Sequence, residues 1–174
     1  LTTVGAAYTN SNAAITLVCG NNNLTYNGAV TNSGLLTTGA NSVTYGGTGA
    51  QTIIAANYSN LATSGARTIN SLTFSGTIGI AGSFTPAATF AGGSNIVTGS
   101  TIDFNGDAAQ NVPAFTYNNL NISNINPSSA AARTKSQTGV VTVNGDLNIG
   151  GYAASITTFQ LGNFNFTALG SSNI

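Results

Sequence analysis

Few residues of this chain could carry acid–base or metal chemistry. The sequence contains no histidine and no glutamate, so Ser-His-Asp and Cys-His constellations cannot form, because their nucleophile needs a base that titrates near neutral pH. Zinc sites built on histidine or on several cysteines are excluded by the same composition. The remaining acid–base candidates are the three aspartates, Asp103, Asp107 and Asp146.

The aspartates all lie beside turn residues. Asp103 and Asp107 flank one Asn-Gly turn, and Asp146 follows a second Asn-Gly pair. An aspartate pair could serve a glycosidase or lyase, and Asp103, Asn105 and Asp107 could hold a weak calcium ion. Aspartate at turns more commonly accepts hydrogen bonds from nearby backbone amides. We therefore predict a protein that is not an enzyme, with no catalytic residue, cofactor or metal site.

Charge is unusually scarce. Charged residues make up 3% of the chain and cancel to a net charge of zero, against about 25% in ordinary soluble proteins. The chain therefore lacks the basic surface that binds nucleic acid or anionic lipid. It also lacks a run of about twenty apolar residues that could cross a membrane as a helix. Because net charge normally keeps copies of a protein apart, we expect self-association, unless attached sugars cover the surface.

Two kinds of residue are candidates for modification or pairing. The single Cys19 lies in an alternating apolar run, which predicts a small buried side chain, with pairing between subunits as the alternative. Asn-X-Ser/Thr sequons, in a number that chance alone would supply, make four asparagines candidate glycosylation sites. These are Asn23, Asn57, Asn121 and Asn165.

The chain contains an internal duplication, in which residues 43–61 match residues 102–120 without a gap. Downstream, residues 73–80 match residues 142–149 after a shift of about ten positions. The duplicated units therefore span about 43–80 and 102–151, with an insertion near 124–132. Identical positions include Gly47 with Gly106, Gln51 with Gln110, Tyr58 with Tyr117, Leu61 with Leu120 and Arg67 with Arg133.

The apolar pattern predicts an all-β fold. β-Branched and aromatic residues alternate with polar ones in short runs, and turn formers separate the runs every eight to twelve residues or so. The duplication and the repeated asparagines favour a β-solenoid resembling a parallel β-helix. The alternative is a β-sandwich or jelly roll with strand exchange, in which the Asn-Gly pairs close hairpins.

The chain of 174 residues suits a single domain at 21–174, preceded by a leading segment at 1–20 that lies outside the duplication. Period-two alternation in this segment predicts strands that form either a cap or a contact with another molecule. Its candidate inter-subunit residues are Val4, Ala6, Tyr8, Ile15 and Leu17.

Threonine is abundant, and a flat threonine-rich face on a neutral β-solenoid would suggest ice binding. The adjacent pairs Thr37-Thr38 and Thr157-Thr158, however, point to opposite faces of a strand. We therefore expect no regular threonine ladder.

The duplicated motifs resemble the repeat module of large secreted surface proteins and adhesins of Bacteroidota. The resemblance covers residues 43–80 and 102–151, through GAQT or AAQN, then YSNL or YNNLNIS, then TVNGDLNIGG. More loosely, the chain is similar to pilin-like extracellular filament subunits. The resemblance implies an extracellular or cell-surface location and no catalytic residues, although such proteins often carry many copies and this chain shows two.

These observations lead us to expect a non-enzymatic structural subunit of an extracellular fibre, pilus or surface layer. We expect it to polymerise with itself by β-strand edge pairing or strand donation, because Lys135 is the only lysine that could blunt an edge. The alternative is a carbohydrate-binding or adhesive module of a larger cell-surface protein. Its glycan ligands would stack on exposed tyrosines such as Tyr58, Tyr117 and Tyr152, although the equivalence of Tyr58 and Tyr117 more simply indicates core or ladder residues.

Overall fold

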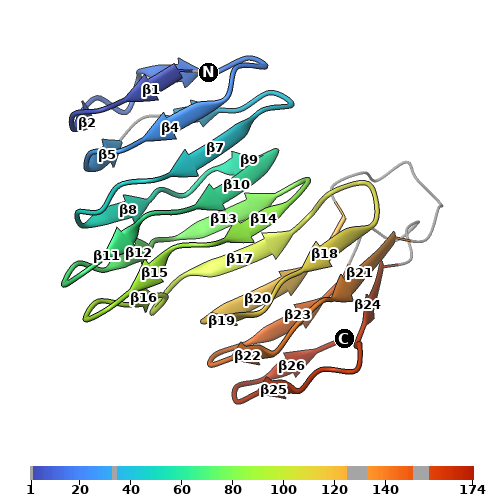
Figure 1. Ribbon diagram of the computed structural model, residues 1–174. Coiled ribbons are helices and arrows are strands. Elements are labelled where there is room, and N and C mark those ends of the chain that lie inside the picture. Colours follow the sequence, from blue (N-terminus) through green and yellow to red (C-terminus); the bar gives the residue numbers. More distant parts are fainter. Residues whose placement is uncertain (1, 33–34, 125–132, 151–156) are drawn as a thin grey trace.

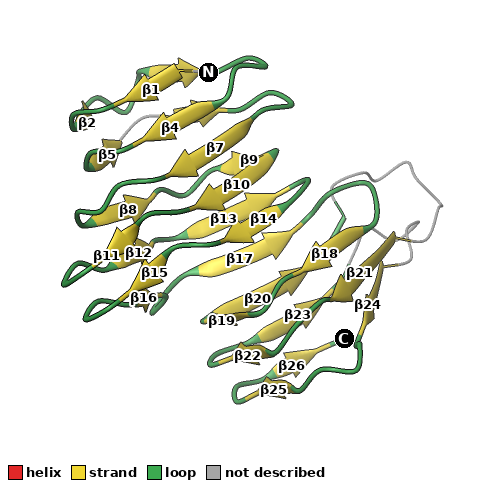
Figure 2. Cartoon of the chain, viewed as in Figure 1, coloured by secondary structure: helices red, strands yellow, loops and turns green. Residues whose placement is uncertain are grey.

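The computed structural model describes residues 2–32, 35–124, 133–150 and 157–174, and within them every regular element is a β-strand (Figures 1 and 2). Every ladder between these strands is parallel. The chain winds into a β-solenoid of about seven turns, with its two termini at opposite ends (Figure 1). The predicted solenoid is confirmed, and the alternative fails because hairpins would require antiparallel pairs.

The first face of the solenoid begins as a five-stranded sheet at the N-terminal end. Its strands are β1 (Thr2–Val4), β4 (Leu24–Tyr26), β7 (Ser42–Tyr45), β10 (Asn60–Thr63) and β14 (Phe84–Pro86). In chain order the face then continues as a separate three-stranded sheet. This sheet contains β18 (Gln110–Val112), β21 (Arg133–Gln137) and β24 (Thr157–Gln160).

The second face is divided into short sheets. They are β2 (Tyr8–Asn10) with β5 (Val30–Asn32); β8 (Gln51–Ile53), β12 (Leu72–Phe74) and β16 (Asn95–Ile96); and β19 (Phe115–Tyr117), β22 (Val141–Val143) and β25 (Phe166–Ala168). A small extra pair occupies the corner between the first and second faces. It consists of β11 (Ala66–Arg67) and β15 (Thr89–Phe90).

The third face starts with a two-stranded sheet of β3 (Thr16–Val18) and β6 (Leu35–Thr37). A six-stranded sheet follows and runs without a break to the C-terminal end. Its strands are β9 (Asn57–Tyr58), β13 (Thr77–Ile80), β17 (Thr101–Phe104), β20 (Asn119–Ile122), β23 (Leu147–Ile149) and β26 (Ser172–Asn173). This face therefore joins the upper and lower turns of the solenoid (Figure 1).

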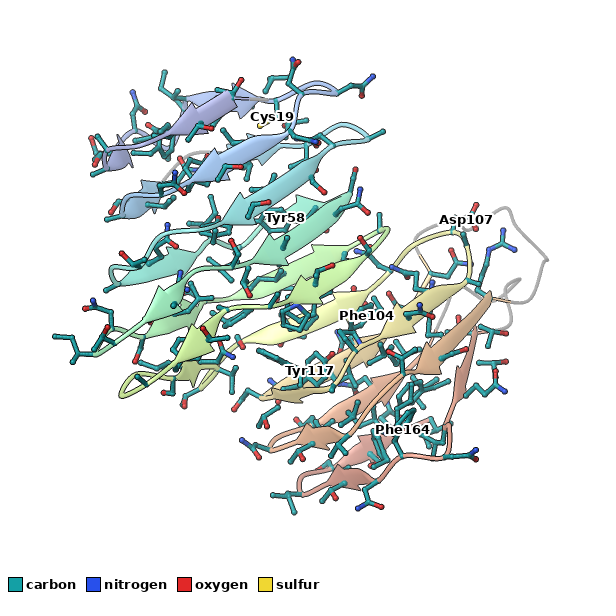
Figure 3. The ribbon with its side chains drawn as sticks, in the orientation of Figure 1. Cys19, Tyr58, Phe104, Asp107, Tyr117 and Phe164 are labelled. Atoms are coloured by element: carbon teal, nitrogen blue, oxygen red, sulfur yellow. The ribbon has the colours of Figure 1, made fainter. Side chains whose placement is uncertain are left out.

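The core is a stack of like side chains inside the solenoid. In strands such as β4, β12 and β22 the two outer residues are buried and the middle residue is partly exposed, as period-two alternation requires. Parallel pairing places Leu24 beside Val43 and Tyr26 beside Tyr45, so that each turn covers the interior of the previous one. Figure 3 shows Tyr58, Phe104 and Tyr117 within this interior stack.

The length of a turn varies strongly along the chain. Val43 pairs with Leu61 on the next turn, whereas Leu120 pairs with Leu147, so the later turn is half as long again as the earlier one. The separation of the two duplicated copies, from Val43 to Ile102, is not a whole number of turns. As a result β7 lies on the first face, whereas its counterpart β17 lies on the third. The stretch 102–120 is therefore rotated by one face relative to 43–61, whereas β22 and β23, which match β12 and β13 downstream, lie on the same faces as their counterparts.

An aromatic cluster fills the interior where the first and second faces are interrupted. Phe115 lies at the centre, with its ring centroid 5.2 Å from Phe74, 5.3 Å from Phe84 and 5.1 Å from Tyr117. Because β14 and β18, like β16 and β19, share no ladder in the described chain, the cluster and the third face hold the two halves together.

The middle residues of many strands form rows of threonine on the outside, so the expectation of no regular threonine ladder was wrong. On the first face, outward residues in register are Thr3, Thr25, Thr44, Ala62 and Thr85. On the second face, a shorter row contains Thr116, Thr142 and Thr167. Variable turn length hides these rows in the sequence, because the threonines recur at irregular intervals.

Candidate functional site at the solenoid ends

The aspartates do not form a common site. The Ser123 hydroxyl donates a hydrogen bond of 2.6 Å to Oδ1 of Asp103, whereas Asp107 pairs with Arg133, whose Nη2 lies 2.6 Å from Oδ1. Burial raises the pKa of Asp103, while Ser123 and Lys135 oppose that rise. No group of three potential ligands among His, Cys, Asp and Glu occurs in the described residues. Figure 3 shows Asp107 on a loop at the periphery.

The glutamines of the duplication are corner residues rather than catalytic ones. Gln51 Oε1 accepts the Gly47 N–H at 3.0 Å, and its Nε2 donates to the Tyr26 and Gly28 carbonyls at 2.9 and 2.7 Å. Gln110 repeats this arrangement. Its Oε1 accepts the Gly106 N–H at 2.9 Å, and its Nε2 donates to the carbonyls of Ile80 and Gly82, each at 2.8 Å.

A buried cation from the following chain segment accompanies each glutamine. Arg67 donates from Nη2 to Gln51 Oε1 at 2.7 Å, and Lys135 donates from Nζ to the Gly106 and Ala108 carbonyls at 2.6 and 2.8 Å. Burial, with a smaller effect of Arg133, lowers the pKa of Lys135 to about 8. Lys135, rather than the sequence-aligned Arg133, is therefore the counterpart of Arg67.

The duplicated tyrosines are core residues, as their equivalence indicated, and cannot stack on sugars, because both are completely buried. The Tyr58 hydroxyl lies 3.0 Å from that of Tyr45 and donates to the Ile54 carbonyl at 2.9 Å, while the Tyr117 hydroxyl donates to the Pro113 carbonyl. Burial raises the pKa of Tyr45 to about 12. The third candidate, Tyr152, lies outside the described residues.

The four sequon asparagines differ in accessibility. Asn57 and Asn165 have exposed side chains, and the exposed Asn23 accepts the Ser42 N–H through its Oδ1 at 2.9 Å. Asn121 is partly buried, and its Oδ1 accepts a hydrogen bond of 3.1 Å from the Asn148 amide on the next turn. Three sequons are therefore exposed, and the fourth belongs to a side-chain ladder of the third face.

The leading segment forms the first turn of the solenoid. Among the described residues β1, β2 and β3 pair on one edge only, with β4, β5 and β6. Val4, Tyr8 and Leu17 pack against the core but remain partly exposed, whereas Ala6 is exposed and Ile15 is 51% exposed. Each face of this end therefore offers an unpaired strand edge beside an apolar interior.

Cys19 lies at the same end. Its side chain is partly buried and packs against the core, and burial raises its pKa (Figure 3). The predicted burial is therefore only partial, because no turn in the described part of the chain covers Cys19 on its outer side.

The C-terminal turn is the counterpart of the first. Its strands β24, β25 and β26 pair on one edge only in the described chain, with β21, β22 and β23. Phe159 and Phe166 stack with ring centroids 5.5 Å apart and are partly exposed, and Phe164 and Leu169 are 49% and 68% exposed. Charged residues occur only between Arg67 and Asp146, so neither end turn contains one.

The chain matches no protein-family model, no curated protein and no solved structure. No helix in the described part of the chain is long and apolar enough to span a membrane.

Proposed function

We propose that this chain is a non-enzymatic structural subunit that polymerises head to tail through its two end turns. The observation that carries the proposal is the pair of open ends, each with three strand edges that have no partner in the described chain. An unpaired edge presents a row of N–H and C=O groups that can template another strand. The polymer would be an extracellular fibre, pilus or surface layer.

The N-terminal end of one molecule fits the C-terminal end of another better than it fits a second N-terminal end. All ladders are parallel, so placing the first turn of one molecule on the last turn of another continues every face in the same sense. Such a heterologous contact does not close on itself and builds an open filament. The partly exposed Val4, Tyr8 and Leu17 at one end would then cover Phe159 and Phe166 at the other.

The usual protections of an edge strand are missing from both end turns. Natural proteins blunt edges with lysine and other charges or with proline. Neither end turn contains a charged residue or a proline in any described strand. Because β1 already belongs to the solenoid of its own molecule, edge pairing is better supported than strand donation.

Two matched lysine variants test this proposal. Thr167 lies on the terminal strand β25, and its register partner Thr142 lies on the internal strand β22 of the same sheet. We expect Thr167→Lys to abolish concentration-dependent growth in light scattering, because it places on the unpaired edge strand the lysine with which natural proteins blunt edge pairing. Thr142→Lys should assemble like the native chain. Native protein that stays monomeric at every concentration, or equal behaviour of the two variants, would contradict the proposal.

Mixing two variants that are each blocked at a different end distinguishes a head-to-tail contact from other contacts between subunits. Thr9→Lys on β2 should block the N-terminal end, as Thr167→Lys blocks the C-terminal end. Each variant alone should remain monomeric, and an equal mixture should form dimers that grow no further. A mixture that stays monomeric, or that forms long polymers, would rule out the head-to-tail contact.

A carbohydrate-binding module of a larger surface protein is the second candidate, and one observation favours it. Between β16 and β19 lies an open cleft of about 670 Å³, lined in part by Phe115, Asn95 and Asn144. An aromatic ring beside amide side chains suits a sugar. A monomeric chain whose migration is retarded in gels containing polysaccharide would support this function instead.

We infer an extracellular or cell-surface location for either function. The support is the resemblance to secreted surface modules and the near absence of charge. Glycans at the exposed Asn57 and Asn165 would add solubility that the chain lacks. Mass spectrometry of the protein from its native source should find the mass of these peptides increased by sugar, and unmodified peptides at both sites would remove that role.

A further inference from the structure

The five-stranded sheet of the first face carries a regular outer row of small side chains. Parallel register aligns residues from β1, β4, β7, β10 and β14, and all of them are at least partly exposed. Four of the five carry a hydroxyl and a methyl group. The members of the row are Thr3, Thr25, Thr44, Ala62 and Thr85.

A second row runs beside the first, two residues earlier along the chain. Asn23, Ser42, Asn60 and Ser83 form it, and hydrogen bonds fix their positions. The Ser42 N–H donates to Asn23 Oδ1 at 2.9 Å, and the Ser83 hydroxyl donates to Asn60 Oδ1 at 2.9 Å. We call these two rows the hydroxyl grid.

The hydroxyl grid has two fixed repeats. Adjacent strands of a sheet lie about 4.8 Å apart, and alternate residues of one strand lie about 6.6 Å apart. Oxygen atoms on the prism face of hexagonal ice recur along two perpendicular directions with repeats of comparable size. The five strands of the grid lie nearly parallel to one another (Figure 1), so the repeats persist along the sheet.

The side chains of the hydroxyl grid are suited to binding ordered water. Each threonine or serine hydroxyl both donates and accepts hydrogen bonds, as a water molecule does. None of the five strands contains a charged residue, and their aromatic side chains Tyr26, Tyr45 and Phe84 are buried. The grid therefore lacks the ionic groups that would bind a dissolved ion and the exposed rings that would stack on sugars.

We propose that the hydroxyl grid binds the surface of an ice crystal. The threonine hydroxyls hold a layer of water in register with the lattice, and their methyl groups fill the spaces between those waters. Because the strands fix the side chains in advance, little conformational entropy is lost on binding. The grid lies on the side of the solenoid, so this function is independent of contacts made by the ends.

Measurement of thermal hysteresis and of partition into slowly growing ice tests the proposal. The native chain should show both activities, and Thr44→Tyr should lose both, because a large ring at the centre of the grid separates it from the crystal. The matched control is Thr142→Tyr on the second face, which should retain both activities. Circular dichroism melting should show that both variants fold like the native protein.

A gain-of-function variant sharpens the test. Ala62 is the one member of the threonine row without a hydroxyl, and Ala62→Thr should increase thermal hysteresis by completing the row. Native protein without either activity, or equal losses in Thr44→Tyr and Thr142→Tyr, would overturn the proposal. Retention on crystalline cellulose or chitin without partition into ice would also overturn it and assign the grid to a polysaccharide surface.

Discussion

At the scale of single residues, the chain stabilises its corners with buried polar groups instead of surface charge. Gln51 and Gln110 each accept a hydrogen bond from a glycine N–H and donate to two carbonyls of the preceding turn. Gly47 must be glycine at such a corner, because a Cβ there would collide with the Asn27 carbonyl. The glutamine motif therefore has a structural role that explains its duplication.

The corner glutamine should contribute strongly to stability. Gln110→Ala removes three hydrogen bonds, two of them buried, and leaves their backbone partners without this side chain, so we expect a loss of about 2 to 4 kcal/mol in the free energy of unfolding. Urea denaturation measures this loss. The exposed Gln160→Ala should change the free energy by less than about 0.5 kcal/mol, and similar effects of the two variants would contradict the corner role.

The buried Lys135 should make the folded chain more stable as the pH rises through the alkaline range. Its pKa is about 8 in the folded chain against its ordinary value of 10.5, so the unfolded chain binds more protons between these values. Stability contributed at this site therefore rises with pH from about 8 to 10.5. The difference in the free energy of unfolding between native protein and Lys135→Met should rise by at most about 1.4 kcal/mol per pH unit there. A difference independent of pH would contradict the burial of the amine.

The raised pKa values of the buried tyrosines should lower the stability of the folded chain as the pH rises further, opposite to the effect of Lys135. Burial raises the pKa of Tyr26, Tyr45, Tyr58 and Tyr117 above 10, so the unfolded chain releases those protons first. Native stability should therefore fall above about pH 10. Comparing native protein with the lysine variant removes this shared effect.

The duplication showed that Gln51 and Gln110 are equivalent, but the sequence did not show that both bind backbone groups at a corner. Their carbonyl partners belong to the preceding turn, outside the matched unit, and no pattern in the sequence marks them. The alignment of Arg67 with Arg133 was also misleading. The insertion before Arg133 lengthens that turn, and Lys135, two residues later, points into the corner.

At the level of single strands, the two inward residues of each short strand build the core, and its one outward residue builds the outer rows of threonine. Triplets such as LTY, LTF and VTV bury their first and last residues and expose threonine between them. These triplets were the available signal for the threonine rows. Adjacent threonine pairs concealed it, and turns of unequal length removed any constant spacing.

The aromatic cluster should control how firmly the upper and lower turns are joined. Phe115→Ala would leave a cavity among Phe74, Phe84 and Tyr117, and we expect a loss of about 2 kcal/mol, because the side chain is only partly buried. Hydrogen exchange should become faster in β14 and β19. The control Phe164→Ala, which is 49% exposed in the native chain, should change neither quantity appreciably.

At the scale of the whole molecule, the duplication predicted a repeated architecture but not the rotation of residues 102–120 relative to residues 43–61. The rotation follows from a separation that is not a whole number of turns, and turn lengths depend on loops whose sequences carry no periodic signal. Within the described residues, the strands of the first and last turns pair on one edge only, and neither of these turns contains a charged residue. Those two properties are the basis for proposing growth along the solenoid axis.

Electron cryomicroscopy of the concentrated protein shows whether the solenoids join end to end. We expect filaments in which strands lie across the long axis with a repeat of about 4.8 Å that continues through each junction between subunits. We also expect β24 to β26 of one subunit to contact β1 to β3 of the next. Separate single particles at all concentrations, or filaments joined through the sides of the solenoid, would contradict end-to-end growth.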